Sequence, residues 1–284
     1  MAKGLNKSEK LRGGLKTASP TYVWPATFCQ SKPRAPQFGQ VQSYADKQVY
    51  VVDSFLNDRV CNDLINWFTA KERGQPTATP VVLETTPLLK SKDYAARVND
   101  RAAMLDHIAS RHLWSLLKPL LETPKSDYET YYDNADEVEN EDEEESFPHE
   151  FKECIGLNPQ LRVYRYIKGH FFKGHYDESV NVEIETPMPP GNTKIALQRG
   201  YTKWTLLVYL SGGESELKGG ETIFYPPTTT GRTAANNAIK INPKKGAALL
   251  HKHGDDCLFH EGAMVTEGAK WILRSDLVWY DKKK

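Results

Sequence analysis

The sequence lacks the features that mark several special classes of protein. No apolar run approaches the roughly eighteen residues that a membrane-spanning helix needs, which argues against an integral membrane protein. The N-terminal residues have no apolar core, so we expect no secretory signal. The four cysteines are scattered without a C-x-x-C pair, which disfavours a disulfide scaffold or a zinc ribbon. We therefore expect a globular protein of the cytosol or nucleus, with no membrane partner.

Charge is balanced over the whole chain but unevenly distributed along it. Residues 127–150 contain twelve Asp or Glu and no Lys or Arg, so the rest of the chain holds 37 basic and 25 acidic side chains. The acidic block has few core-forming aliphatic residues, which predicts a disordered insertion. Residues 1–45 are rich in Lys, Gly, Pro and Ser and predict a flexible basic tail. Residues 46–284 then form one domain that carries the insertion.

Apolar patterning predicts helices in the first half of the domain and strands in the second. An alternating run at 48–56 predicts an opening strand, and apolar stripes predict helices at 58–72 and 104–121. From residue 161 onward, short β-branched and aromatic runs follow one another between Gly, Pro and Asn. Strands in succession without intervening helices favour an antiparallel sandwich or barrel. We predict a mainly β fold with flanking helices (α+β), a double-stranded β-helix or cupin-like jelly roll supported by two N-terminal helices.

One stretch of the β-rich half carries residues suited to metal chemistry. His175 and Asp177 lie two positions apart, so on a strand their side chains point to the same face. His260 follows on another β-rich run. Two histidines and one carboxylate that leave coordination positions open are the facial triad of non-haem Fe(II) oxygenases. Because an H-x-D pair is common by chance, a surface or hydrogen-bonded histidine is the competing interpretation of His175 taken alone.

A basic residue downstream strengthens the metal hypothesis. Lys270 follows His260 by ten positions, and its ammonium suits a dicarboxylate whose other end binds iron. The chain here resembles the prolyl 4-hydroxylase-like branch of the 2-oxoglutarate- and Fe(II)-dependent dioxygenases. Four motifs carry the resemblance: Y-x-x-G-x-x-F-x-x-H-x-D at 166–177, TLLVYLS at 205–211, GGETIFYP at 219–226 and H-x4-V-x4-K at 260–270.

The resemblance implies roles for individual residues. His175, Asp177 and His260 resemble the iron ligands, and Lys270 resembles the residue that pairs with the distal carboxylate of 2-oxoglutarate. Tyr209 stands where related hydroxylases place a tyrosine beside that carboxylate. The resemblance also implies that Tyr166 forms a second wall of the cosubstrate site, although a tyrosine packed in the core explains it equally well.

Other residues compete for these roles. His251 and His253 also precede Lys270, but neither has the ten-residue spacing, and we expect His251 to reach the rim of the cavity or the core. Arg274 points the same way as Lys270 on a strand and is the rival anchor for the carboxylate; a substrate contact or a structural salt bridge are its other interpretations. In the RVNDR segment at 97–101, we expect Asn99 or Asp100 to cap the second helix.

The other interpretation of the RVNDR segment is that Arg97 and Arg101 line a substrate entrance.

The resemblance implies Fe(II), 2-oxoglutarate and O2 as cofactors, with ascorbate as a further candidate. It also implies hydroxylation of a C–H bond, with release of succinate and CO2, in a prolyl residue of a protein or peptide. Two alternatives stay open: an oxygenase acting on nucleic acid or on lysine residues, and a catalytically silent jelly-roll binding or scaffold protein.

Overall fold

The computed structural model describes residues 21–34, 40–76, 80–88, 95–122, 147, 149–187, 195–227 and 237–280. Most of the predicted basic tail and nearly all of the predicted acidic insertion lie outside these residues. The helices are α1 (Ala26–Cys29), α2 (Asp58–Phe68) and α3 (His107–Glu122), with 3-10 turns at His149–Glu153 and Gly254–Asp256. No helix in the described part is long and apolar enough to cross a membrane.

The strands form one continuous antiparallel sheet in the described residues. Its members are β1 (Val41–Tyr44), β2 (Val49–Val52), β3 (Glu84–Thr86), β4 (Arg97–Leu105), β5 (Cys154–Leu157), β6 (Gln160–Ile167), β7 (Phe171–His175), β8 (Asn181–Pro187), β9 (Ile195–Tyr209), β10 (Leu217–Gly219), β11 (Thr222–Tyr225), β12 (Ile239–Ile241), β13 (Ala248–Lys252), β14 (Phe259–Gly262) and β15 (Val265–Tyr280). Along the sheet the order is β1-β2-β13-β9-β15-β6-β4-β7-β14-β11-β12.

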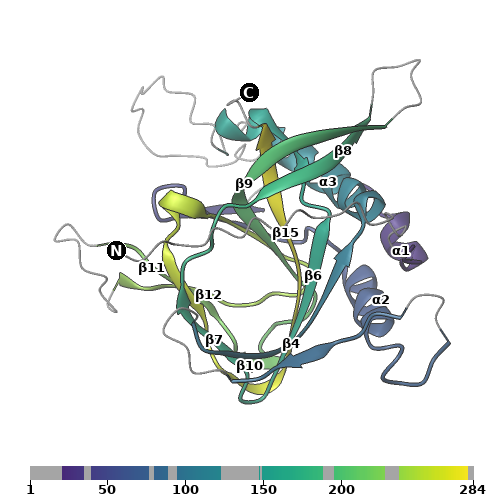
Figure 1. Ribbon diagram of the computed structural model, residues 1–284. Coiled ribbons are helices and arrows are strands. Elements are labelled where there is room, and N and C mark those ends of the chain that lie inside the picture. The colour runs from purple at the N-terminus through teal and green to yellow at the C-terminus, as the bar shows by residue number, and fades with distance from the viewer. Residues whose placement is uncertain are drawn as a thin grey trace, which may run out of the picture.

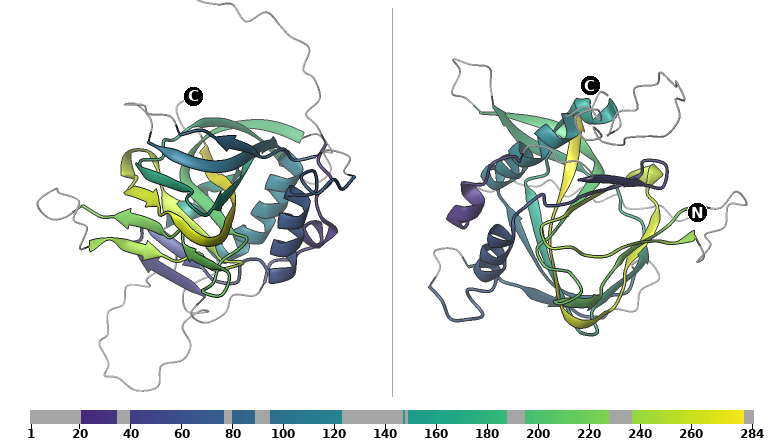
Figure 2. Two further views of the ribbon diagram at one scale, coloured as in Figure 1. Left: turned by 90° about the horizontal axis from the view of Figure 1, so that it is seen from below. Right: turned by 180° about the vertical axis from the view of Figure 1, so that it is seen from behind.

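The sheet curls on itself until its two ends face each other (Figure 1). Six pairings separate β13 from β14 along the sheet, yet the rings of His251 on β13 and His260 on β14 lie 4.7 Å apart between centroids. The helices gather along one flank of this barrel, outside β4 and β6 (Figures 1 and 2). The predicted jelly roll with supporting helices is confirmed.

Strand alternation divides the side chains between two cores. On β9, Trp204, Leu206 and Val208 face outward and join the layer between sheet and helices. Leu207 and Tyr209, at the alternate positions, face the interior of the barrel. The same alternation on β15 sends Trp271 and Leu273 outward. The interior therefore receives the other half of each strand, which here includes polar and charged residues.

The helix boundaries differ from the sequence expectation at the RVNDR segment. Residues 97–105 form strand β4, so α3 begins at His107, and neither Asn99 nor Asp100 caps it. Asp106 is the cap, because its Oδ1 accepts the backbone N–H of Ala109 at 2.9 Å. Asp100 instead pairs with Arg165 at 2.7 Å. The expectation failed because an Asn or Asp before a helix predicts a cap only when the backbone there has left the strand.

The predicted tail at 1–45 contains α1 and β1, and residues in its middle are anchored to the helical flank. Trp24 and Phe28 are buried, and their rings lie 5.0 Å apart. The indole N–H of Trp24 donates to Oδ2 of Asp106 at 2.8 Å. One carboxylate therefore caps α3 and holds the segment that precedes α1.

We predict that Asp106→Ala destabilises the fold by about 1–3 kcal/mol, because it removes a helix cap and a hydrogen bond to a buried indole. Asp106→Asn should lose less, since an asparagine caps equally well. Urea unfolding measures both variants. Equal losses in the two would show that the cap contributes little and that another property of the carboxylate is required.

Candidate metal centre and cosubstrate pocket

A cavity of about 130 Å³ opens inside the barrel and collects most of the residues that the sequence motifs single out. Strands β4, β6, β7, β9, β11, β13, β14 and β15 all contribute to its wall. Its lining includes Arg97, Tyr164, Tyr166, Phe172, His175, Asp177, Leu207, Thr222, His251, His260, Lys270, Ile272 and Arg274. Tyr209, fully buried, lies next to this lining through a 2.8 Å hydrogen bond to Thr222.

The structure brings His175, Asp177 and His260 together. His175 ends β7 and lies directly across the ladder from His260 on β14. Nε2 of His175 is 3.6 Å from Oδ1 of Asp177, and Nε2 of His260 is 4.0 Å from Oδ2. Donor atoms about 2.1 Å from a common metal ion are separated from one another by about 3–4 Å. The three side chains thus have the spacing of a metal-binding set.

The backbone orients both imidazoles. Nδ1 of His175 lies 2.9 Å from the carbonyl oxygen of Lys173, and Nδ1 of His260 lies 2.9 Å from that of Leu258. A carbonyl only accepts hydrogen bonds, so Nδ1 carries the proton in each ring and Nε2 presents a lone pair. Burial lowers the pKa of both rings, to about 4 for His175, so they are neutral near pH 7.

Asp177 is held as a carboxylate by its neighbours. Burial acts to raise its pKa, but the Arg274 guanidinium 3.0 Å away and the surrounding histidines hold the pKa well below its usual value. Thr205 donates a further hydrogen bond to Oδ2 at 3.0 Å. Two neutral nitrogen donors and one anionic oxygen donor are a set that fits Fe(II).

Of the two positions expected for His251, the rim of the cavity and the core, the structure shows a buried position, from which the side chain lines the metal cavity. Its Nδ1 bonds the carbonyl oxygen of Lys252 at 3.1 Å, which turns Nε2 toward Asp177, 3.8 Å from Oδ2. The side chain is 2% exposed, and Nε2 has no hydrogen-bond partner among the residues that the structure describes. Such a buried, unpaired nitrogen is uncommon and marks a position where a bound group is expected. The ten-residue spacing to Lys270 set His251 aside, because spacing along the chain does not show that β13 and β14 meet across the barrel.

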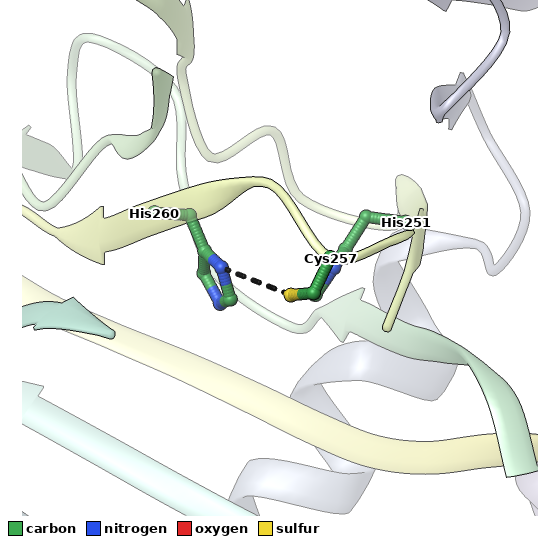
Figure 3. A group of neighbouring side chains, drawn as sticks. All are labelled: His251, Cys257 and His260. Atoms are coloured by element: carbon green, nitrogen blue, oxygen red, sulfur yellow. Dashed lines mark hydrogen bonds between the residues drawn. The ribbon is translucent and has the colours of Figure 1, made fainter. Parts of the chain in front are cut away.

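Cys257 is a further neighbour, which no sequence motif singled out. Its sulfur lies 3.9 Å from Nδ1 of His260 and accepts the backbone N–H of Asp177 at 3.2 Å. His251, Cys257 and His260 are close enough to hold an ion by themselves (Figure 3). Burial, however, raises the pKa of the Cys257 thiol to about 11, which keeps it protonated, whereas Asp177 is already ionised.

His253 has a structural position. Its Nδ1 contacts Thr205 at 3.0 Å and its Nε2 contacts Thr202 at 2.8 Å, so both ring nitrogens are paired. Through Thr205 it helps to hold the hydroxyl that bonds Asp177. This histidine has no free nitrogen for a metal.

Lys270 extends into a pocket formed by aromatic and small residues. Its ammonium donates to the carbonyl oxygen of Gly220 at 2.5 Å and to Oγ1 of Thr222 at 3.3 Å. The same ammonium lies 5.8 Å from the ring centre of Tyr166 and 5.5 Å from that of Tyr209. Tyr166 and Tyr209 therefore both lie beside the Lys270 ammonium.

Gly220 makes the room for this lysine. It adopts a positive φ of 77°, and a Cβ there would lie 3.3 Å from Cδ of Lys270. Burial lowers the pKa of Lys270 to about 7, although the charge of Glu221 partly opposes the shift. The carboxylate of a ligand would supply the charge partner that the pocket lacks.

Residues 161–279 match the model of the 2OG-Fe(II) oxygenase superfamily. No curated protein sequence matches the chain. The chain carries a 2OG-Fe(II) oxygenase domain. It is a 2-oxoglutarate-dependent dioxygenase that uses Fe(II), 2-oxoglutarate and O2, which confirms the resemblance to the 2-oxoglutarate- and Fe(II)-dependent dioxygenases, the enzyme class and these three cofactors.

Solved structures of similar fold include three prolyl hydroxylases. A viral collagen prolyl hydroxylase from Paramecium bursaria Chlorella virus-1 is 20% identical, over 82% of this chain and 97% of that one, with a TM-score of 0.44. A Pseudomonas putida prolyl-4-hydroxylase is 11% identical, over 82% and 93%, with a TM-score of 0.45. A Trichoplax adhaerens prolyl hydroxylase, in complex with a hypoxia inducible factor peptide fragment, is 15% identical, over 82% and 84%, with a TM-score of 0.46. The family assignment rests on the match at 161–279.

In this oxygenase domain, Arg274 contacts the metal centre and not the lysine pocket. Besides Asp177, its guanidinium bonds Thr205 at 3.3 Å and Oδ1 of Asp276 at 3.1 Å. The salt-bridge interpretation matches these contacts, and they place the guanidinium beside the carboxylate of Asp177. Arg97 lies at the cavity wall over the ring of Phe172, 5.4 Å from its centre, and Arg101 lines a neighbouring cavity.

The pKa of Lys270 leads to a prediction about stability. Between about pH 7 and pH 10.5 the unfolded chain keeps a proton that the folded chain has released, so folding stability rises with pH across this window. Lys270→Met should therefore gain stability over the wild type mainly at or below about pH 7, and the gain should shrink toward pH 10.5.

Urea unfolding of the two proteins across this pH range measures the effect. Lys218→Met is the matched control, because Lys218 is an exposed lysine on β10 and its removal should have little influence at any pH. A difference between Lys270→Met and the wild type that stays constant with pH would contradict the lowered pKa.

Proposed function

We propose that this dioxygenase hydroxylates a prolyl residue of a protein or peptide, with the metal held by His175, Asp177 and His260. The observation that carries the site is that Nε2 of His175 and Nε2 of His260 lie close to the Asp177 carboxylate, so that three donor groups meet in the cavity that also holds Lys270. The motif order shared with prolyl 4-hydroxylase-like enzymes supports the prolyl substrate. When bound, Fe(II) and 2-oxoglutarate supply the oxidising chemistry, with release of succinate and CO2.

The protein's own residues hold the proposed metal ligands in position. The backbone carbonyls on Nδ1 fix the ring planes of His175 and His260, so that both lone pairs are directed before the metal arrives. Arg274 and Thr205 fix the carboxylate of Asp177 in the same way. The charge of Arg274 also offsets the cost of burying that carboxylate.

Lys270 is proposed to bind the distal carboxylate of 2-oxoglutarate. Tyr166 and Tyr209 flank its ammonium with rings that exclude water, which strengthens a charge-assisted hydrogen bond. Asn99 donates to the hydroxyl of Tyr166 at 3.2 Å and so positions that ring. Arg97, Arg101 and Arg274 are proposed to face the substrate, because the first and last line the cavity and Arg101 lines its neighbour.

Loss of any proposed ligand should abolish turnover. We expect His175→Ala, Asp177→Ala and His260→Ala each to lose Fe(II)-dependent formation of succinate from 2-oxoglutarate, because two protein donors cannot keep the facial geometry. His253→Ala, which removes a histidine with both nitrogens paired, should keep most of the activity. A fully active His260→Ala protein would refute the ligand assignment.

The proposed role of Lys270 predicts a change in cosubstrate affinity. Lys270→Ala should raise the KM for 2-oxoglutarate about ten- to a hundredfold, since a buried charge-assisted contact contributes on the order of 1.5–3 kcal/mol. In the wild type, KM should rise with pH above about 7, where the free lysine loses its proton, and Lys270→Arg should remove that rise.

Arg274→Ala is the comparison for this experiment. Its guanidinium bonds Asp177 and Asp276, so its loss should leave the KM for 2-oxoglutarate nearly unchanged. A large increase in KM for Arg274→Ala, together with an unchanged KM for Lys270→Ala, would make Arg274 the anchor instead.

A further inference from the structure

The metal cavity continues into a second cavity whose charge is positive. This neighbour has a volume of about 220 Å³ and shares Arg97, Tyr164 and Arg274 with the metal cavity. Its remaining lining is Arg101, Ala102, Ala103 and Arg162. Four arginines thus line one cavity, and none of its lining residues is acidic. We call it the arginine cavity.

Strand register explains why the arginines lie side by side. Across the ladders, Arg274 on β15 is opposite Arg162 on β6, and Tyr164 on β6 is opposite Arg101 on β4. Arg97 precedes Arg101 by four residues on β4 and shares its face. Like charges on adjacent strands cost stability. An ordinary solvated surface mixes charges of both signs, whereas this cluster contains four positive side chains.

The counter-charges around the cavity are too few for four guanidinium groups. Asp276 serves both Arg162 and Arg274, each at 3.1 Å. Asp177, the other carboxylate at Arg274, is a proposed metal ligand. Neither Arg97 nor Arg101 has a carboxylate within 4.0 Å among the described residues. The arginine cavity is thus short of negative charge, and arginine forks bind carboxylates well.

A third cavity adjoins the arginine cavity at Arg101, Ala102 and Ala103, residues that do not line the metal cavity. It has a volume of about 310 Å³ and is otherwise lined by Tyr22, Pro80, Val81, Val82, Glu84 and Met104. A phosphate backbone needs a continued series of cations, and single-stranded nucleic acid also needs stacking platforms. The third cavity has a single cation, Arg101, beside the acidic Glu84, and a single aromatic ring, Tyr22, so it does not continue the series of cations that a phosphate backbone needs. An extended peptide, in contrast, places residues of different chemistry in successive cavities.

We propose that the substrate is an acidic peptide segment, whose Asp or Glu side chain binds in the arginine cavity while a neighbouring residue enters the metal cavity. This rests on the proposed function for the identity of the metal cavity. Arg97 and Arg101 are the principal contacts, because neither guanidinium lies within 4.0 Å of a carboxylate in the described part of the chain; Glu84, opposite Arg101 across the β3–β4 ladder, lines the third cavity. Arg162 adds to the positive field while it remains paired with Asp276.

Four short fluorescent peptides test the proposal on the full chain. They carry either Pro or Ala at the centre, flanked by either two Glu or two Gln, and their binding is followed by fluorescence anisotropy at low salt. The wild type should bind the Glu peptides about tenfold more tightly than the Gln peptides. Arg97→Gln and Arg101→Gln should each reduce this preference. Arg199→Gln should not, because Arg199 is an exposed arginine paired with Glu183 on β8.

The results separate the two proposals. Equal binding of Glu and Gln peptides, or a preference that survives in both arginine variants, overturns the acidic-peptide proposal whatever the enzyme does. Failure of the wild type to form succinate from 2-oxoglutarate, or stimulation by Ala peptides as strong as by Pro peptides, overturns the proposed function instead. A single-stranded oligonucleotide that binds more tightly than the Glu peptides, and depends on Arg101, would replace the peptide with nucleic acid.

A different observation carries a second inference, which concerns His251. Its Nε2 is as near to the Asp177 carboxylate as that of His260, at 3.8 Å against 4.0 Å. The same nitrogen is buried without a partner, which costs stability unless a bound group satisfies it. The ring of His251 packs between those of Phe224 and His260, with centroid distances of 5.3 and 4.7 Å, so the orientation is fixed.

We infer that His251 is a third imidazole ligand when 2-oxoglutarate is absent, in addition to the proposed triad. Four protein donors would leave two positions of an octahedral ion open instead of three. The metal would then bind more tightly to the free protein than a triad alone allows.

Titration of the full chain with Co²⁺, followed by its visible absorption, tests this inference without turnover. His251→Ala and His251→Phe, of which the second keeps the bulk of the ring, should each weaken Co²⁺ binding about tenfold or more and change the spectrum. His112→Ala, which removes a histidine on α3 that bonds the carbonyl of Phe28, should match the wild type.

Wild-type affinity and spectrum in both His251 variants would overturn the inference. So would an equal loss in Cys257→Ser, because that result would place the ion between His251, Cys257 and His260. Failure of the wild type itself to bind Co²⁺ would count against the proposed metal centre as a whole.

Discussion

The buried carboxylate of Asp177 is the constraint around which the site is arranged. It lies just beyond β7, inside a sheet that has closed around it, where an isolated charge would be costly. Arg274 from β15, Thr205 from β9 and three imidazoles from β7, β13 and β14 all face it. Because these partners come from five strands, the geometry of the carboxylate depends on closure of the barrel. The fold and the metal centre are therefore specified together.

Strand alternation directs one set of side chains to the outside of the barrel, against the helices, and the other set, which includes the polar and charged residues of the site, to its interior. The outward positions of β9 and β15 bury Trp204 and Trp271 against the helical flank, and this layer supplies most of the hydrophobic stabilisation. The inward positions are then free to hold Lys270, Arg274 and Tyr209. This division lets buried charges lie close together, because the outer layer does not depend on them.

The sequence predicted the parts of the site that depend on spacing within one strand or one motif. His175 with Asp177, and His260 with Lys270, follow from residue types at short separations, and the structure places all four in one cavity. His251 was considered and set aside on spacing, and Cys257 was missed, because their importance arises from the meeting of β13 with β14 across the barrel. No local pattern carries that information.

Strand β4 shows a second reason for incomplete prediction. Its segment RVNDR is dense in charge, and a charged run suggests a turn or a helix cap. In the structure these charges face the interior polar surface and the arginine cavity, or pair with Arg165, so the usual alternation of apolar and polar residues does not appear. Strands that line a polar active site lose the hydrophobic signal by which strands are recognised.

We propose that one cavity holds both the metal, at His175, Asp177 and His260, and the cosubstrate carboxylate, at Lys270. A crystal structure of the chain with Mn²⁺ and 2-oxoglutarate, prepared without oxygen, would show both positions. We expect the ion within bonding distance of Nε2 of both histidines and of an Asp177 oxygen, with the distal carboxylate on the Lys270 ammonium. An ion bound by His251, Cys257 and His260 with Asp177 unbound, or a carboxylate held by Arg274, would contradict it.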